Sequence, residues 1–514
     1  MTITPGSPDD DRRADDPAGS VAAPPGPDAD SAGGDFSADR RFFGHPLALA
    51  NLFSVELWER FSFYGMQAVM AYYLYYSLAE GGLGLPEEAA TSIIGAYGGM
   101  VYLACVAGAW ICDRVLGAER TLFSSACTVM LGHLALALIP GLPGVVVGLL
   151  LVALGSGGVK TSATTVVGSL YRRDDPRADA GFSIFYMGVN IGALVGPLLT
   201  GLAQERIGFH WAFGLAAVGM ALGLGIYVTG RKNLPASSAV VPNPLPGGAW
   251  VRPLVGVVVA AVVVVLLFVV GVLTAENLST AVAIVVALIS IGLFTLLLRS
   301  PRVTAVERSR VRSFIPMWLA SVVFWSLFQQ QFTVVTLYSD VRLDRSLGGW
   351  EMPIAWVNSL EPFFVIVLAP LFAVLWTKLG ERGPSTPVKF ALGAGGMGVA
   401  FLLFLPWAGG TGNTTPVLAI VLIMLVFALA EMNLSPVGLS LSTRIGPDLF
   451  RSQAVALFYL SVSLGSALAG TMAGYYDPST EGTYFTVIGI GALVLGGVLF
   501  ALAPWIRRAM HGVR

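Results

Sequence analysis

Three charged residues lie within five positions of one another in the apolar, aromatic segment VELWERFSFYGMQAVMAYYL. On a helix, Glu56 lies three residues before Glu59 and four before Arg60, so the three side chains share one face. Phe63 and Gln67 extend that face. Two carboxylates that share one arginine in a low dielectric cannot both be comfortably ionised. One of them is expected to exchange protons near neutral pH, as a proton-coupling site must. A static triad that fixes helix packing is the alternative.

Three further charged residues interrupt long apolar runs. They are Lys160 in GSGGVKTSATTVVGS, Glu361 in WVNSLEPFFVIVLAP and Glu431 in FALAEMNLSPVGLSLS. A charge at the centre of a bilayer costs between about 2.5 and more than 10 kcal/mol, so such residues normally have a function or a partner. Two other acidic residues, Asp113 and Glu205, lie close enough to the ends of apolar runs to face water.

Membrane helices must position these residues. The chain has 514 residues, of which only 12% are charged, and its mean hydropathy is +0.74. Soluble domains average roughly 25% charged residues. Apolar runs of about 20 residues, long enough to cross a bilayer, recur along the chain. They predict an all-α integral membrane protein with fourteen spans, near residues 47–78, 91–113, 120–140, 144–170, 181–204, 210–230, 253–273, 279–299, 314–338, 350–378, 387–407, 416–441, 452–475 and 483–505.

The N-terminal segment 1–42 has a different composition. It is rich in Asp, Pro, Ala, Gly and Ser and contains no apolar run that could form a core, which predicts a disordered tail. It also lacks the apolar stretch of a secretory signal, so no cleavable signal peptide is expected.

Basic residues gather in alternate loops and predict the orientation. One set of loops and the C-terminus carry Arg114, Arg120, Arg172, Arg173, Arg177, Arg231, Lys232, Arg252, Arg299, Arg302, Arg308, Arg310, Arg312, Lys378, Arg382, Lys389, Arg444, Arg451, Arg507 and Arg508. The opposite loops hold only Arg206, Arg342 and Arg345. The positive-inside rule then predicts a multi-pass protein of the cell membrane with both termini in the cytoplasm.

Other kinds of chemistry find little support in the sequence. Cys105, Cys112 and Cys127 have no CxxC spacing and are expected to be buried thiols. The four histidines are scattered, so no metal or other cofactor is expected. No GxxxxGK[ST] loop is present, which argues against ATP as the energy source. No nucleophile–base cluster suggests an enzyme, and the expected partners are the lipid bilayer and a small solute, not nucleic acid.

Four segments resemble one family, the proton-dependent oligopeptide transporters of the major facilitator superfamily. The first helix contains its ExxERFxxYG pattern, from Glu56 to Gly65, and FSIFYMGVNIGALVGP resembles its signature near helix five. The third segment is EMNLSPVGLSLSTRIGPDLFRSQAVALFYLS. The fourth, GAWICDRVLGAERT, resembles the superfamily's loop between helices two and three. Its matching residues, expected to act in gating or structure, are Gly108, Asp113, Arg114, Gly117 and Arg120.

The resemblance implies a major facilitator fold with two six-helix bundles, at 47–232 and 312–507. Two inserted helices, at 250–300, would lie between them and face lipid. It also implies a monomer that imports di- and tripeptides with protons by alternating access. Arg60 and Lys160 resemble the residues that receive the peptide carboxylate, and Glu431 resembles the acid that holds its amino terminus. Further substrate-binding residues implied or expected near them are Tyr64, Gln67, Tyr102, Asn190, Gln329, Glu361 and Phe458.

The chain also departs from the family pattern. Gln329, in FWSLFQQQF, stands where the family usually has an acid, and Glu361 precedes Pro362 where it usually has Asn. We hypothesise that Glu361 pairs with Lys160 across the cavity or carries a second proton; the alternative is that it recognises a different substrate group. Phe63 and Gln67 replace a common Tyr and Arg, and KTSATT replaces the usual Lys-Pro-Asn or Lys-Ala-Asn.

Three alternative functions remain at this stage. A transporter of the same fold could carry nitrate, an amino-acid derivative or a peptide-like natural product, possibly outward, and the exchange of acids between Gln329 and Glu361 favours it. A non-transporting nutrient sensor would be supported by a large folded cytoplasmic domain, which the sequence lacks. A membrane-embedded enzyme would need a catalytic cluster.

Overall fold

The computed structural model describes residues 39–171, 175, 177–246, 248–249, 251–447 and 450–513. Most of the predicted tail, together with Arg172 and Arg173, lies outside these residues. The helices are α1 (Leu47–Tyr75), α2 (Glu87–Ile111), α3 (Ala118–Leu138), α4 (Gly141–Ser169), α5 (Ala178–Arg206), α6 (Phe209–Gly230), α7 (Val251–Val269), α8 (Leu278–Arg299), α9 (Ala305–Phe328), α10 (Val334–Arg342), α11 (Val357–Leu379), α12 (Thr386–Leu402), α13 (Val417–Ile445), α14 (Arg451–Ala473) and α15 (Glu481–Ala509).

The all-helical membrane fold predicted from hydropathy is confirmed. Thirteen helical segments of the described chain are long and apolar enough to cross a bilayer. The 29-residue α1, which carries the charged triad, is the fourteenth long segment. Helices α9 and α10 belong to one span, because a short 3-10 turn, Gln329–Phe332, joins them. The only strands of the described residues are two-residue pairs, in which β1 (Leu343–Asp344) lies parallel to β4 (Thr415–Pro416) and β2 (Ser346–Leu347) antiparallel to β3 (Trp350–Glu351).

Several predicted boundaries were wrong. The span expected from residue 350 begins as α11 at Val357, because Trp350–Glu351 pairs as a strand and the turn Ile354–Trp356 follows Pro353. The span expected at 314–338 runs instead from 305 to 342, since the amphipathic ends of α9 and α10 remain helical beyond the apolar stretch.

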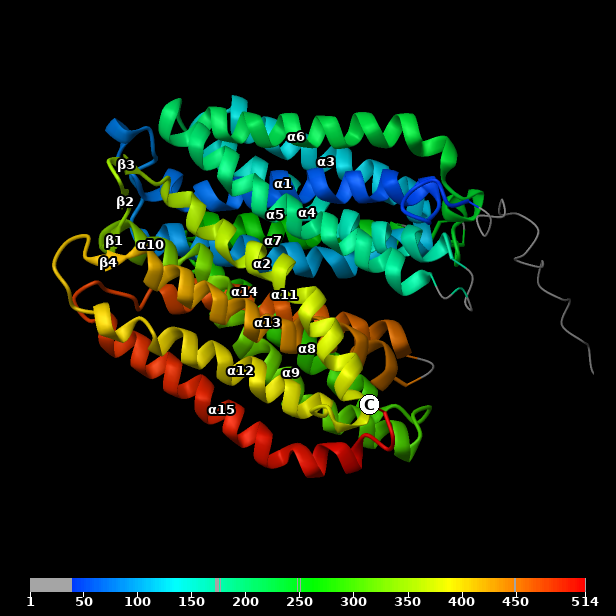
Figure 1. The fold of residues 1–514 in the computed structure, drawn as a ribbon. Coiled ribbons are helices and arrows are strands. Elements are labelled where there is room, and N and C mark those ends of the chain that lie inside the picture. The colour runs from blue at the N-terminus through cyan, green and yellow to red at the C-terminus, as the bar shows by residue number, and fades with distance from the viewer. Residues whose placement is uncertain are drawn as a thin grey trace, which may run out of the picture.

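Helices α1–α6 form one group and α9–α15 another (Figure 1). In the first, α1 packs on α5 and α6, and α3 packs on α4; in the second, α12 packs on α13 and α15. Each group has its own buried apolar core. The two groups meet near the strands and diverge toward the end that carries the C-terminus.

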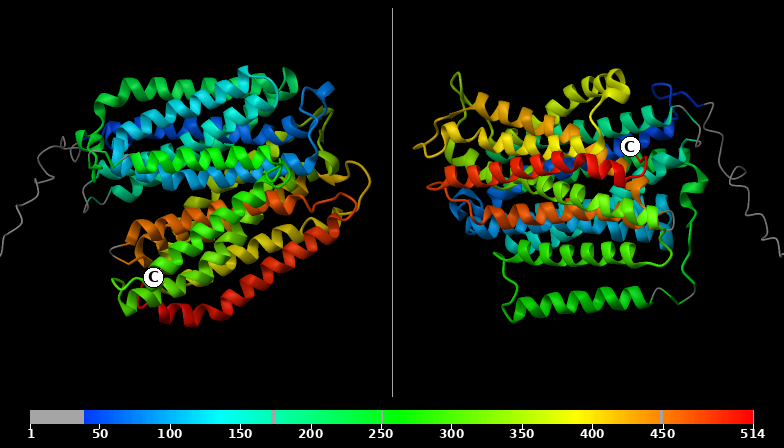
Figure 2. Two further views of the ribbon diagram at one scale, coloured as in Figure 1. Left: turned by 180° about the vertical axis from the view of Figure 1, so that it is seen from behind. Right: turned by 90° about the horizontal axis from the view of Figure 1, so that it is seen from below.

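The two inserted helices differ in their surroundings. No described residue of α7 is buried, and the helix lies at the margin of the molecule (Figure 2). Helix α8 instead packs against α2, α9 and α14 and buries Ser279, Ala283, Val286, Ser290 and Leu297. The lipid-facing position expected for both therefore describes α7 better than α8.

Candidate functional site

The charged triad of α1 is buried within the membrane region. Arg60 Nε lies 2.5 Å from Glu59 Oε2 and 3.3 Å from Glu56 Oε1. Glu59 has a second partner, because Ser156 Oγ on α4 donates to its Oε1 at 2.7 Å. Glu56 Oε2 and the two terminal nitrogens of Arg60 have no hydrogen-bond partner among the described residues. Glu59 is thus fixed from two sides, whereas Glu56 and Arg60 keep unused hydrogen-bonding capacity.

Close helix packing places the triad against α5. At Gly192, a Cβ atom would clash with Leu57 O and lie 2.9 Å from Arg60 Cβ. At Gly196 it would clash with Phe61 O. Small residues allow two membrane helices to approach closely, so these glycines let α1 and α5 line one cavity together.

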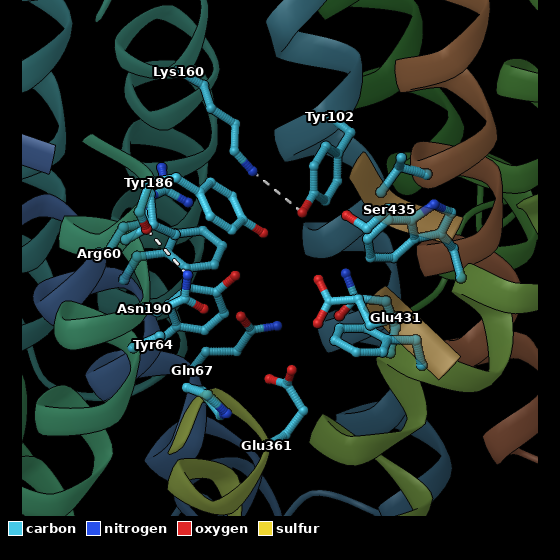
Figure 3. A pocket seen from close by; sticks show the side chains of 18 of the residues that line it. Arg60, Tyr64, Gln67, Tyr102, Lys160, Tyr186, Asn190, Glu361, Glu431 and Ser435 are labelled. Atoms are coloured by element: carbon cyan, nitrogen blue, oxygen red, sulfur yellow. Dashed lines mark hydrogen bonds between the residues drawn. The ribbon is translucent and has the colours of Figure 1, made fainter. Parts of the chain in front are cut away.

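That cavity has a volume of about 210 Å³ and lies between the two helix groups. Figure 3 shows its side chains converging from both walls. Every predicted proton-coupling or substrate-binding residue lines it except Glu59, which lies behind Arg60. These lining residues are Glu56, Arg60, Tyr64, Gln67, Tyr102, Lys160, Asn190, Gln329, Glu361, Glu431 and Phe458.

Cation-bearing side chains occupy the wall built by α1, α2, α4 and α5. Lys160 Nζ lies 3.3 Å from the hydroxyl of Tyr102 and 4.4 Å from the centre of its ring. The amide of Asn190 donates to Tyr186 O, one helical turn earlier, at 3.1 Å. Because Lys160 and Arg60 both line the cavity, this wall suits an anionic group.

Acidic side chains occupy the opposite wall. Glu361 on α11 and Glu431 on α13 are 6% and 7% exposed and interact directly with each other, and Ser435 lies beside Glu431. Gln329, at the position where an acid was expected, donates its amide to Ser466 Oγ on α14 at 3.1 Å. The acid that helix α9 lacks therefore has a counterpart on α11.

The expected pairing of Glu361 with Lys160 is not formed in this structure. Lys160 contacts Tyr102, whereas the carboxyl neighbour of Glu361 is Glu431, and the two groups lie at opposite sides of the cavity (Figure 3). The other two roles expected for Glu361, a second proton carrier and recognition of a different substrate group, remain predictions.

The residues of the predicted gating loop lie away from the cavity. A Cβ atom at Gly108 would meet Gly158 Cα at 2.7 Å, so this glycine brings α2 and α4 together. Asp113 and Arg114 lie in a π-helical turn whose backbone carbonyls accept from Asn243 N and Leu245 N. The side chain of Arg120 is exposed.

Sequence reasoning missed several cavity residues that spacing could have indicated. Asn358 lies three residues before Glu361, Ser435 four after Glu431 and Tyr186 four before Asn190, so each shares a helix face with a predicted residue. Phe332, which stacks on Tyr64 from the other helix group with 6.2 Å between ring centres, gave no such signal.

A second set of contacts, also missed, closes the cavity at the end near the strands. The hydroxyls of Tyr75, the last residue of α1, and of Tyr76, which caps that helix, both donate to the carboxylate of Asp340 on α10, each at 2.8 Å. Arg345 binds Glu205 at the end of α5, at 3.1 Å. The cavity is open instead at the end with the basic loops.

Exposed lining residues mark that opening. Tyr186 and Leu439 are 44% and 36% exposed, and Thr164 is also exposed. All three lie on the halves of their helices that lead to the basic loops. Among the described residues, no group of three or more His, Cys, Asp or Glu side chains could hold a metal ion.

Comparisons with known proteins agree with this architecture. The sequence profile of the POT family matches residues 119–487. An uncharacterized transporter, YclF of Bacillus subtilis (strain 168), is 40% identical over 474 residues, covering 92% of this chain and 96% of that protein. A di-/tripeptide transporter of Lactococcus lactis subsp. lactis (strain IL1403) is 36% identical over 490 residues, covering 93% and 99%.

Solved structures give the same result. The crystal structure of a peptide transporter POT in complex with sulfate has a TM-score of 0.88 and 43% identity, covering 92% of this chain and 98% of that one. A POT family transporter in complex with 5-aminolevulinic acid has a TM-score of 0.86 and 34% identity, covering 91% and 98%. The profile spans most of the chain, and the relatives align over nearly their full length, so this multi-pass membrane protein belongs to the POT family of transporters.

Proposed function

We propose that the chain is a proton-coupled symporter that imports di- and tripeptides by alternating access, driven by the proton electrochemical gradient. The observation that carries the proposal is the division of charge across the cavity. Arg60 and Lys160 lie on one wall and Glu361 and Glu431 on the other. A zwitterionic peptide offers one anion and one cation a few ångströms apart, so the two walls complement its ends.

The triad of α1 supplies a means of coupling. When a proton binds to Glu56 or Glu59, the hold of that carboxylate on Arg60 weakens, and the guanidinium is free to bind the substrate carboxylate. Two nitrogens of Arg60 already lack a hydrogen-bond partner among the described residues, which supports this role. When the proton leaves, Arg60 pairs again with both carboxylates and the substrate is released.

The placement in the membrane follows from the same proposal. The basic loops lie at the open end of the cavity, so by the positive-inside rule this structure is open to the cytoplasm, with both termini on that side of the cell membrane. The proposed bundles, 47–232 and 312–507, rock about the cavity, with the inserted helices at 250–300. One chain supplies the whole cavity, which supports a monomer as the transport unit.

Uptake by proteoliposomes tests the coupling role. We expect Glu56→Gln and Glu59→Gln to abolish uphill uptake of dialanine driven by an inwardly directed proton gradient while counterflow exchange continues. Glu276→Gln, in the exposed turn between α7 and α8, is the matched control. Full pH-driven uptake by both triad variants would contradict the proposed coupling site.

A second candidate is transport of an amino-acid derivative. It is favoured by the acid on α11 in place of one on α9, and by the likeness to a solved relative in complex with 5-aminolevulinic acid. Competition of a dipeptide library and of 5-aminolevulinic acid against labelled dialanine, across pH, separates the two candidates.

A further inference from the structure

The acidic wall of the cavity holds two carboxyl groups where one would be enough to bind an ammonium ion. Glu361 and Glu431 come from different helices, face each other and are more than nine-tenths buried (Figure 3). Among the described residues, the hydroxyl of Ser435 also forms a hydrogen bond with Glu431. The pair is therefore an unusual concentration of negative charge inside a membrane protein.

No cation of the described residues balances this pair. The titratable groups that face Glu361 are Glu431 on α13, Tyr64 on α1 and Tyr186 on α5, all acidic or neutral. Lys160 is occupied with Tyr102, and Arg60 with Glu56 and Glu59. Two adjacent carboxylates without a cation cannot both be charged in a low dielectric, so the pair holds one proton between its two groups.

Two hydrogen-bond acceptors beside the pair lack a donor. Glu361 Oε1 and Asn358 Oδ1 are buried and have no hydrogen-bond partner among the described residues. They lie one helical turn apart on α11, and both residues line the cavity. A primary ammonium carries three N–H donors and one positive charge, which matches these two acceptors together with a carboxylate of Glu431.

We propose that the Glu361–Glu431 pair exchanges its shared proton for the primary ammonium of the substrate. No covalent bond of the substrate forms or breaks: the O–H proton passes to water in the cavity, the ammonium keeps its three hydrogens, and one positive charge replaces another. Glu361 then determines both the specificity for a primary ammonium and the number of protons released on binding. Substrate binding releases one proton from the acidic wall, while the α1 triad retains its own. The proposal rests on the proposed function for its substrate class.

Isothermal titration calorimetry of the purified full chain tests this exchange. Dialanine binding at pH 7 in two buffers of different ionisation enthalpy gives the number of protons released per ligand. We expect dialanine binding to release about one proton fewer from Glu361→Gln than from the wild type. A glutamine at position 361 shares no proton with Glu431, whose carboxylate can still bind the ammonium. Glu361→Asp keeps a second carboxyl group and should retain the release; Glu276→Gln is the control for the wild-type value.

Two outcomes would overturn the exchange. The first is equal proton release by the wild type and Glu361→Gln when both proteins show cooperative thermal unfolding. It would show that the released proton comes from another group. Binding of N-acetyl-dialanine as tight as that of dialanine would show that the ammonium is not recognised. If dialanine does not bind the wild type, the proposed function fails, and the same titration with 5-aminolevulinic acid, which also has a primary ammonium, decides the exchange. Absence of binding by both ligands would overturn both proposals.

Discussion

Tyr76 and Asp340 join the two halves of the transporter. The phenol of Tyr76, directly after α1, donates to the carboxylate of Asp340 on α10 at 2.8 Å, and Tyr75 donates to the other oxygen of the same carboxylate. These bonds, here called the outer latch, lie at the end of the cavity that is closed. They can form only while the two helix groups are in contact at this end, so they stabilise its closed state.

Removing one phenol of the outer latch should shift the conformational equilibrium. A hydrogen bond to a charged acceptor contributes about 1.5–3 kcal/mol, so Tyr76→Phe should increase the population that is open at this end by roughly ten- to a hundredfold. Spin labels at Leu78 and Leu347, two exposed positions on opposite halves, would report the opening as longer distances in electron resonance. Tyr475→Phe, an exposed phenol, is the control. Identical distance distributions for the three proteins would exclude a latch.

Ser156 should hold Glu59 in place within the α1 triad. Its hydroxyl donates to Glu59 Oε1 at 2.7 Å. Ser156→Ala leaves that buried oxygen without its donor, so the rate of proton-driven dialanine uptake should fall by roughly tenfold, an effect of about 1.4 kcal/mol. Ser162→Ala, on the same helix but bonded to Gly158 O, should leave the rate unchanged; a loss of equal size there would assign the effect to helix packing.

Gly108 should be required for packing of α2 on α4. A methyl group there would lie 2.7 Å from Gly158 Cα and 3.0 Å from Gly157 O, so Gly108→Ala must push the helices apart. We expect a loss of about 1–3 kcal/mol of stability, seen as a lower unfolding temperature in detergent. Gly225→Ala, with no atom within 4 Å of the new methyl group, should be neutral or slightly stabilising. Equal unfolding temperatures for both variants would contradict the packing role.

Moving an acid back to α9 should compensate for its loss on α11. We expect Glu361→Gln to lower the rate of pH-driven uptake by roughly tenfold, an effect of about 1.4 kcal/mol. Adding Gln329→Glu should restore part of the uptake rate, because position 329 lines the same cavity and the substitution places a second carboxyl group there again. The single variant Gln329→Glu measures the effect of an additional acid. A double variant that is no better than Glu361→Gln would show that the position of the acid, not its presence, matters.

Hydropathy and local spacing predicted the helices and the charged face of α1, because both depend on residues close in sequence. The 3-10 turn at Gln329–Phe332 could not be predicted in this way, since its three consecutive glutamines are good helix formers and do not by themselves indicate a break. Spacing along one helix could have identified Asn358, Ser435 and Tyr186. It could not reveal the outer latch, whose partners are 264 and 265 residues apart.

The acidic wall shows the same limit. The sequence indicated that Glu361 and Glu431 both lie within the membrane, and the exchange of acids between positions 329 and 361 suggested Lys160 as one possible partner of Glu361. The structure places the two acids together instead, because α11 and α13 pack side by side while Lys160 projects from the other wall. Opposite charges in a sequence do not determine which side chains form a pair in the fold, because a buried carboxyl group can be neutralised by a proton as well as by a cation.

Helix α8 holds an unusual mechanical position. Its second residue, Ser279, contacts both helix groups. The backbone N–H of Ser279 donates to Ser92 Oγ on α2 at 3.1 Å, and Ser279 Oγ lies 3.1 Å from Thr471 Oγ1 on α14. The rest of the helix presents mainly apolar side chains to its neighbours. Under alternating access, we expect α8 to stay fixed at the end that holds Ser279, while its apolar side chains allow α2 and α14 to slide along the rest of the helix. The hydrogen bonds of Ser279 would then limit how far the two helix groups can rock relative to each other.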